Sequence, residues 1–281
     1  MLEGVLSMQN LISDPVSMTS CRQEAYLLRL RRQFPFVYVK TLTRTAFGRS
    51  VYALQFGSGS RKLLITAGHH ANETITSDAV WQWLFTFCNA LLDGRTVCGA
   101  EARELYHNAM VYLVPLVNPD GADLAAGICA PGSPEYRAAA DIAAQYLDIP
   151  FPSGWKANLR GVDLNLNYPA RWEAARRIKK AQGVSTPAPR DFAGFSPLDQ
   201  PETAALDRAR RLTGLLSSET EAAVCRVSID ARRGQISRVY SVRLDAPCDE
   251  KAFAEKLQMP SVRYKENARP AVPHGEKRLA H

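Results

Sequence analysis

The chain has 281 residues, 46% of them hydrophobic and 22% charged, which is typical of a globular protein with one substantial core. It contains no apolar run of the roughly 18 residues that a membrane-spanning helix needs, so no membrane span is expected. Its 35 Lys and Arg outnumber its 28 Asp and Glu and give a net charge of +7.

The excess of positive charge is concentrated near the C-terminus. From Cys225 onward there are 12 Lys and Arg against 7 Asp and Glu, so this segment carries +5 of the total. Neither a nucleic-acid motif nor interleaved aromatic residues accompany these charges, so no nucleic-acid partner is expected. The N-terminus has no Lys or Arg ahead of its apolar residues, and Asp14 and Pro15 interrupt it. It is a poor secretory signal and favours a cytoplasmic location, although export by another route stays open.

The cysteines are scattered and include no C-x-x-C pair, so neither a zinc knuckle nor a redox pair is indicated. Reduced, mostly buried thiols are expected instead. The residues concerned are Cys21, Cys88, Cys98, Cys129, Cys225 and Cys248.

Hydrophobic periodicity predicts helices and strands in the first part of the chain. Leu27, Leu28 and Leu30 recur among arginines at helical spacing, whereas the later apolar runs alternate or are continuous in the manner of strands. Ser77 is a plausible N-cap of the second helix and Gly94 a plausible stop. The expected elements are a helix over 24–34, strands over 36–41, 51–56 and 63–67, and a helix over 76–92.

The second part of the chain continues the alternation of strands and helices. A strongly apolar strand is followed by the turn sequence Asn118-Pro119-Asp120-Gly121. The expected elements are a strand over 110–117, a helix over 135–146, a short strand-like piece over 162–164, a long surface loop over 183–201 and a helix over 202–216. This order predicts an α/β fold, with a mixed central sheet and helices on both of its faces.

One local pattern points to metal chemistry. His70 and Glu73 form an H-x-x-E pair directly after the buried strand over 63–67. An imidazole and a carboxylate on one tight turn are suitable zinc ligands, provided that one more protein ligand and a water complete the set. A hydrogen-bonded structural histidine is the alternative interpretation of the pair by itself.

Three motifs that follow one another in the chain give this pair a context. They read HHANETIT from His69, NPDG from Asn118 and WKANLRGVDLNLNYPARWE from Trp155. Together they resemble the zinc carboxypeptidase family, and the similarity extends over residues 24–215. The resemblance implies a zinc-dependent peptidase on a zinc carboxypeptidase-like fold, acting on a peptide substrate.

The resemblance assigns roles to individual residues. His70 and Glu73 match the first two zinc ligands of the family. Lys156 matches a basic residue that stabilises the developing oxyanion, with a solvated surface lysine as the alternative. Asn165 matches an asparagine that helps to hold the substrate. Asp163 is expected to orient the zinc-binding histidine, and His69 to have a supporting or structural role.

The residue after Asn165 changes the expected substrate. Many carboxypeptidases have an arginine there, which binds the free α-carboxylate of the substrate through a bidentate fork. Here it is Leu166, which neither hydrogen-bonds nor carries charge. The surrounding pattern is more similar to the γ-D-glutamyl–diamino acid endopeptidases of peptidoglycan metabolism. A muropeptide is therefore the expected substrate.

Two functional groups of the family have no match. The family has a third zinc ligand, a histidine expected around residues 220–240, but that region contains none. Asp230 is the nearest residue able to bind metal, and its neighbours do not match. The family also has a catalytic glutamate near its end that acts as general base, whereas Glu266 and Glu276 are candidates by proximity only.

Two explanations for this loss stay open. A frameshift or truncation of the gene near residue 220 would leave 220–281 as a divergent basic tail of uncertain fold on a single peptidase-like domain. Alternatively, the chain has diverged into a catalytically inactive member that at most binds cell-wall peptides. The sequence predicts no oligomeric state.

Overall fold

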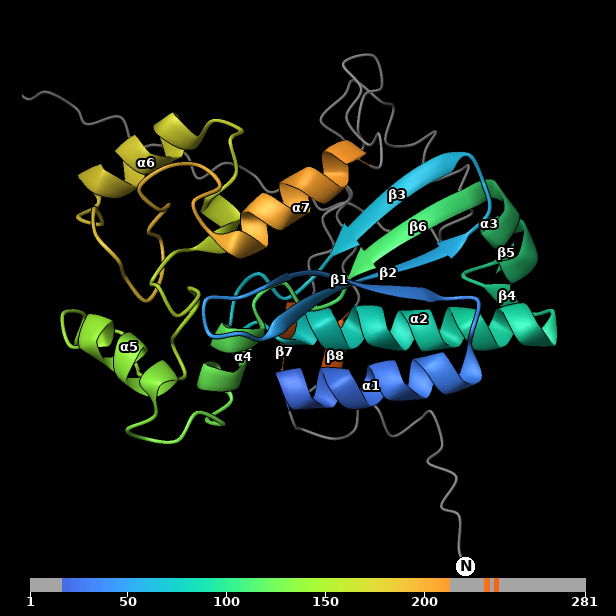
Figure 1. Cartoon of the computed structure of the whole chain (residues 1–281), viewed down its shortest axis with the longest axis horizontal. Coiled ribbons are helices and arrows are strands. Elements are labelled where there is room, and N and C mark those ends of the chain that lie inside the picture. The colour runs from blue at the N-terminus through green and yellow to red at the C-terminus, as the bar shows by residue number, and fades with distance from the viewer. Residues whose placement is uncertain (1–16, 213–229, 233–234, 238–281) are drawn as a thin grey trace, which may run out of the picture.

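A mixed sheet forms the centre of the molecule in the computed structural model of the chain, which describes residues 17–212, 230–232 and 235–237 (Figure 1). Within the described residues this sheet has four strands in the order β1-β2-β6-β3. β1 pairs with β2 and β2 with β6 in antiparallel fashion, whereas β3 runs parallel to β6. The predicted α/β class with a mixed sheet is confirmed.

Most elements lie where the hydrophobic pattern predicts them. The strands of the sheet are β1 (Tyr38–Arg44), β2 (Ser50–Gly57), β3 (Arg61–Thr66) and β6 (Ala109–Val114). The helices in the described part are α1 (Ser20–Gln33), α2 (Ile75–Asp93), α3 (Ala102–Asn108), α4 (Pro119–Ala125), α5 (Pro134–Ala143), α6 (Trp172–Ala181) and α7 (Pro201–Leu212). Short hairpins join β4 (Thr96–Val97) to β5 (Ala100–Glu101) and β7 (Asp230–Arg232) to β8 (Gln235–Ser237).

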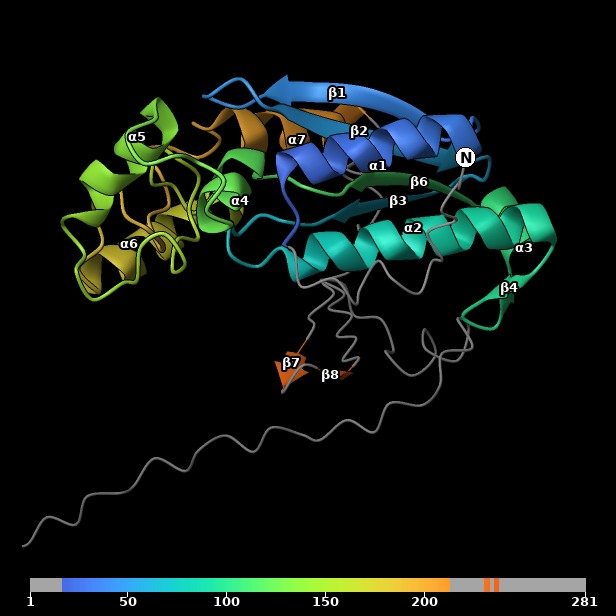
Figure 2. The same ribbon diagram turned by 90° about the horizontal axis from the view of Figure 1, so that it is seen from below.

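Apolar residues alternate between two cores because successive side chains of a strand point to opposite faces. Leu54 and Phe56 of β2 belong to the core that α1 and α2 cover. Val51 faces the other way and shares a core with Leu206 of α7, which packs against β1. Figure 2 shows α1 and α2 lying side by side along their face of the sheet. Helices therefore cover both faces, as predicted.

Some local predictions are wrong. Ser77 is not a cap but a buried residue inside α2, which follows Thr74 and ends at Gly94 as expected. NPDG does not make a simple turn: Asn118 caps α4, and Pro119 occupies its first turn, where a missing N–H costs nothing. The piece over 162–164 leads into a 3-10 turn, Leu164–Leu166, instead of a strand.

The segment over 183–201 is irregular as predicted, but much of it is not on the surface. Ala188, Phe192 and Ala193 are almost fully buried. Hydrophobic periodicity also failed to predict α3 and α6. In α6 the apolar residues Trp172, Ala175 and Ile178 recur at helical spacing opposite the basic residues, so the sequence contains a pattern that the prediction did not use.

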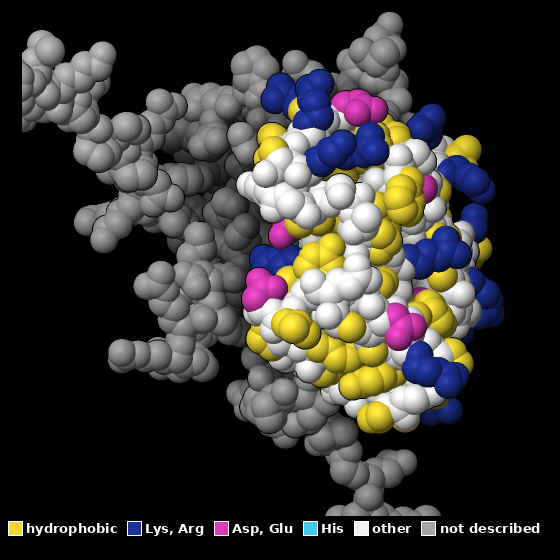
Figure 3. Space-filling model, turned by 90° about the vertical axis from the view of Figure 1, so that its left-hand side faces the viewer, with side chains coloured by type: hydrophobic (Ala, Val, Ile, Leu, Met, Phe, Trp, Pro, Cys, Tyr) yellow, Lys and Arg dark blue, Asp and Glu magenta, His cyan; other side chains and the backbone are white. Residues whose placement is uncertain are grey.

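The surface of the described part bears several basic groups. Figure 3 faces the end of the molecule that carries α5 and α6 and shows Lys and Arg side chains gathered at its top, at the height of α6 in Figure 1. Cys88 and Cys129 are buried free thiols, whereas Cys21 and Cys98 are exposed, so burial is confirmed for only half of the described cysteines. No helix in the described ranges has the length and apolarity to cross a bilayer.

The turn after β3 requires a glycine. Gly68 has a φ of +65°, and a Cβ there would lie 2.6 Å from Ser77 Oγ and 2.7 Å from Leu116 Cδ1. Gly127 has a similar φ of +74°, but a Cβ at that position would meet nothing within 4 Å. The two glycines therefore share a left-handed backbone conformation, and they differ in the room available for an added Cβ.

We expect Gly68→Ala to lower the free energy of unfolding by about 3 kcal/mol, because it combines a left-handed backbone with overpacking. Gly127→Ala, the matched control, should cost only about 1 kcal/mol, since it carries the backbone effect alone. Urea denaturation of the two variants measures the difference. Equal losses in both would contradict the close packing at Gly68.

Helix α7 begins with a buried carboxyl group. Glu202 is 1% exposed, and its Oε2 has no hydrogen-bond partner among the described residues. Burial disfavours the charged form and raises the pKa of Glu202 to about 7 from 4.5. A raised pKa means that the folded protein holds this proton more tightly than the unfolded chain does.

We predict that Glu202→Gln becomes progressively more stable than the parent as pH rises from about 4.5 to 7. In the parent, the unfolded carboxyl ionises first, which costs up to about 3 kcal/mol of stability by pH 7 and above. The amide cannot ionise and escapes this loss. Thermal or urea unfolding at several pH values measures the difference in stability between parent and variant. Glu173→Gln, at an exposed position, is the control. A parent-to-variant difference that does not change with pH would refute the prediction.

Candidate active site

The candidate site lies where the parallel strands β3 and β6 end. Beyond the strands the two segments stay joined, because Val117 N donates to Ala67 O at 3.0 Å and Asn118 N donates to Gly68 O at 2.9 Å. This continuation holds the turn that begins at His69 beside the start of α4. Loops at the carboxyl ends of strands are the usual place for sites in α/β sheets.

His70 and Glu73 converge on one point. His70 Nδ1 lies 2.9 Å from Glu73 Oε2, and the backbone N–H of Glu73 donates to His70 O at 3.2 Å. The second ring nitrogen, Nε2, lies 3.2 Å from Asp163 Oδ1. Asp163 is buried and also accepts from the N–H groups of Asn165 and Asp191. Its carboxylate is therefore fixed, and it fixes the orientation of the imidazole.

Lys156 comes to the same point from a distant segment of the chain. Its Nζ forms an ion pair with Glu73 Oε1. Its backbone is anchored on both sides, since Lys156 O accepts from Ala71 N at 3.0 Å and Lys156 N donates to Pro189 O at 2.9 Å. The lysine side chain is only 21% exposed, so most of it is shielded from solvent beside Glu73.

The charges of these groups depend on one another. The hydrogen bond to Asp163, followed by that to Glu73, raises the pKa of His70 to about 9, against the opposing effect of burial. The hydrogen bond from His70, assisted by Lys156, lowers the pKa of Glu73 to about 2. At neutral pH an imidazolium and an ammonium therefore face two carboxylates. Binding a metal through His70 requires the imidazole to lose its proton.

Asn118 holds the loops of the site together. Its Nδ2 donates to His69 O at 3.1 Å and to Ala157 O at 3.0 Å, while its Oδ1 accepts from Gly121 N at 3.0 Å. The two hydrogen bonds that this buried amide donates and the one that it accepts thus reach three different segments of the chain. The sequence predicted only a turn role for Asn118, and its place in NPDG was the one signal available.

A second buried asparagine, Asn167, supports the segment after Asp163. Its Nδ2 donates to the carbonyls of Ala193 and Ser196 and to Asp199 Oδ1, and its Oδ1 accepts from Thr203 Oγ1 at 2.7 Å. No role was predicted for this residue. Its partners lie 26 to 36 positions further along the chain, so no local pattern reports the role.

The remaining expected residues are placed as follows. His69 Nε2 lies 2.9 Å from the hydroxyl of Tyr168, a supporting contact to the segment that follows Asp163. Asn165 and Leu166 occupy the 3-10 turn after Asp163, and Asn165 is exposed. Asp230 lies in β7, and its side chain is outside the described part. Glu266 and Glu276 also fall outside the described residues.

The fit of zinc to these groups is partial. His70 Nδ1 and Glu73 Oε2 are atoms that zinc accepts, and the contact of His70 with Asp163 is the kind of outer hydrogen bond that metal-binding histidines make. A catalytic zinc needs three protein ligands. Within residues 17–212 and the two short strands beyond, no three His, Cys, Asp or Glu side chains form a metal-binding group. The described residues thus bring together two candidate ligand groups, His70 and Glu73, and do not complete a set of three.

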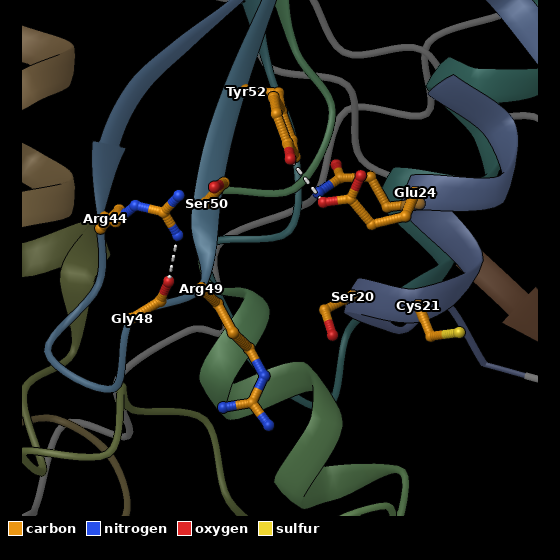
Figure 4. Close-up of a pocket in the computed structure, with 9 residues that line it drawn as sticks. Ser20, Cys21, Glu24, Arg44, Gly48, Arg49, Ser50 and Tyr52 are labelled. Atoms are coloured by element: carbon orange, nitrogen blue, oxygen red, sulfur yellow. Dashed lines mark hydrogen bonds between the residues drawn. The ribbon is translucent and has the colours of Figure 1, made fainter. Parts of the chain in front are cut away.

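A polar pocket of about 320 Å³ lies apart from these residues, between the start of α1 and the β1–β2 turn (Figure 4). Arg49 on its wall is already engaged, with Nε 2.7 Å from Asp123 Oδ2 and Nη1 3.0 Å from Asp120 Oδ1. Glu24 likewise accepts from the Tyr52 hydroxyl. The pocket contains none of the predicted site residues, so we do not regard it as the active site.

Comparison with known proteins agrees with the geometry. A profile of the family described as zinc carboxypeptidase matches residues 23–220. γ-D-Glutamyl-L-diamino acid endopeptidase 1 of Lysinibacillus sphaericus is 35% identical over 199 residues, which are 70% of this chain and 48% of that protein. The uncharacterized protein YqgT of Bacillus subtilis strain 168 is 36% identical over 178 residues, 62% of this chain and 45% of its own length.

The fold has a counterpart among solved structures. The crystal structure of thrombin activatable fibrinolysis inhibitor superposes with a TM-score of 0.54 at 16% identity, over 73% of this chain and 50% of that one. At this identity the likeness concerns the fold alone. The chain spans about half the length of the curated relatives it matches.

Proposed function

This chain belongs to the zinc carboxypeptidase family, and from that premise we propose that it is a zinc-dependent peptidase that hydrolyses γ-D-glutamyl–meso-diaminopimelate bonds in peptidoglycan peptides. The relative from Lysinibacillus sphaericus, whose name states such an activity, supports the choice of substrate. The observation that carries the proposal is the convergence of His70 Nδ1 and Glu73 Oε2, with His70 Nε2 held by Asp163.

In this proposal His70 and Glu73 are two zinc ligands, and no residue is assigned as the third. Zinc, when bound, polarises the scissile carbonyl and lowers the pKa of a bound water. Asp163 keeps Nδ1 of His70 directed at Glu73 by engaging the opposite ring nitrogen. Because Asp163 is itself held by two backbone N–H groups, the imidazole needs no reorganisation when a ligand arrives.

Lys156 is the proposed group that stabilises negative charge on the carbonyl oxygen. Its ammonium contacts Glu73, so it lies beside the point on which His70 and Glu73 converge. A fixed cation in a partly buried place stabilises a developing oxyanion more strongly than a solvated one does. Its anchored backbone supports this role over that of a solvated surface lysine.

Asn165 is the proposed substrate-binding residue next to Leu166. It is exposed on the same 3-10 turn that Asp163 begins, and its position is therefore fixed relative to His70. Leu166 offers no group for a free α-carboxylate. An endopeptidase, whose scissile bond is not defined by a terminal carboxylate, fits this surface better than an exopeptidase does.

A second function is favoured by one specific observation. Among the described residues, two candidate ligand atoms come together, and no group of three side chains able to hold a metal is found. Two protein ligands hold zinc poorly. The alternative proposal is a catalytically inactive member that binds cell-wall peptides without cutting them.

The test is hydrolysis of L-Ala-γ-D-Glu-meso-diaminopimelate by the purified full chain, measured together with its zinc content. We expect about one zinc per chain, release of diaminopimelate, and loss of both after His70→Ala, because a chain deprived of one of three ligands no longer retains the metal. A chelator should abolish hydrolysis in the parent.

The matched control is His107→Ala, which removes a histidine that contacts Ser58 and takes no part in the site. It should keep zinc and activity. Peptide binding without zinc or cleavage in the parent would replace the peptidase with the inactive binder. Cleavage that survives both the chelator and His70→Ala would exclude the proposed mechanism altogether.

A further inference from the structure

Helix α6 concentrates positive charge next to the candidate site. Its ten residues include Arg176, Arg177, Lys179 and Lys180 but only one acidic side chain, Glu173. The Lys and Arg side chains that gather at the upper edge of Figure 3 lie at the height of this helix. Nothing in the proposed mechanism uses the cations of α6.

One side of α6 forms a small pocket with the irregular segment that follows it. The pocket has a volume of about 160 Å³, enough for a small anionic group. Phe192 and Ala193 at its base are buried and therefore fixed. The lining residues are Arg176, Lys179, Lys180, Val184, Ser185, Phe192 and Ala193.

The cations of this pocket are only partly neutralised. Lys179 Nζ lies 2.8 Å from Asp191 Oδ1, and this contact helps to lower the pKa of Asp191. Arg176 and Lys180 have no carboxylate of the described residues within salt-bridge distance. Arg176 instead lies over the ring of Trp172, 5.3 Å from its centroid. A guanidinium stacked in this way keeps its N–H groups available for an anion.

The same pocket is connected to the candidate active site. Trp172, the platform under Arg176, is tied to the pocket base because its Nε1 donates to Ala193 O at 2.9 Å. Asp191 N donates to Asp163 Oδ2 at 3.3 Å, and Asp163 is the carboxylate that orients His70. One residue thus contacts both Lys179 of the pocket and Asp163 of the site.

We infer that the pocket between α6 and residues 184–193 binds a carboxylate of the substrate peptide. This inference rests on the proposed function. A γ-linked glutamyl residue leaves its α-carboxylate free, and a terminal diaminopimelate adds two more carboxylates, so such peptides need cationic partners. Leu166 offers none, whereas Arg176 and Lys180 offer a guanidinium fork and an ammonium group.

The test measures binding of L-Ala-γ-D-Glu-meso-diaminopimelate to the full chain by calorimetry, with a chelator present so that no cleavage occurs. The double variant Arg176→Ala/Lys180→Ala should bind about tenfold more weakly, because two charge-assisted hydrogen bonds are lost. The same peptide with its carboxylates converted to amides should bind the parent and the double variant equally. Affinity of the parent should fall as salt rises.

Two controls separate charge in the pocket from charge on the helix. Arg177→Ala removes one cation from the same helix without touching the pocket lining, and it should bind within about twofold of the parent. Arg176→Lys/Lys180→Arg keeps both charges and should retain most of the affinity. Circular dichroism of each variant confirms that α6 and the fold are intact.

The outcomes distinguish this inference from the proposed function. Equal peptide binding by the parent and the double variant overturns the inference and leaves the proposed function standing. If the chelated parent binds no peptide and the zinc-loaded parent cleaves none, the proposed function fails, and binding of inorganic phosphate is then compared. If the parent binds phosphate and the double variant does not, the pocket binds an anion other than the substrate carboxylate. The inference is then overturned. Binding of neither probe overturns both.

Discussion

The arrangement of the candidate site depends on the side-chain amide of Asn118. This one group donates to the carbonyls of His69 and Ala157 and accepts from Gly121 N, all at hydrogen-bond distance and out of contact with water. The turn after β3, the start of α4 and the segment that carries Lys156 are thereby fixed relative to one another. Loss of one hydrogen-bond partner of a buried amide costs about 1–3 kcal/mol of folding free energy. The three segments therefore have to move together.

The ionisable side chains of the candidate site, which these segments hold in place, balance one another in charge. His70 and Lys156 face Glu73 and Asp163, and the contacts of His70 with Glu73 shift both groups toward their charged forms. The same atoms that neutralise one another here, His70 Nδ1 and Glu73 Oε2, are the ones that zinc accepts. Metal and proton therefore compete for His70, and metal and ammonium compete for Glu73. Zinc must displace this proton and this ammonium group before it can bind. Whether it is retained therefore depends on how many further ligands it finds.

In the proposed function, substrate recognition depends on cations other than the arginine that many family members have after the matched asparagine. Leu166 removes a cation from the turn beside Asp163, while α6 places several cations one contact further away, beyond Asp191. Lys179 is neutralised by Asp191, but Arg176 is held over Trp172 with its charge uncompensated in the described part of the chain. Near the site, positive charge is therefore carried by Lys156 and by α6, and none is carried by the turn that follows Asp163. In the proposed function, this arrangement suits a substrate with carboxylates at some distance from the scissile bond.

The sequence by itself determined the sheet and the family. The alternating run of β2 and the continuous apolar runs of β3 and β6 identified these strands, because side-chain periodicity follows directly from backbone geometry. Family motifs likewise singled out His70, Glu73 and Lys156 before their side chains were seen to meet. Only the tertiary structure decided the rest. The local sequence indicates only a turn role for Asn118 and none for Asn167, since their partners are distant in sequence. The sequence analysis predicts no helix at α6, although its apolar residues recur at helical spacing, and the pocket beside α6 exists only through packing against Phe192 and Ala193.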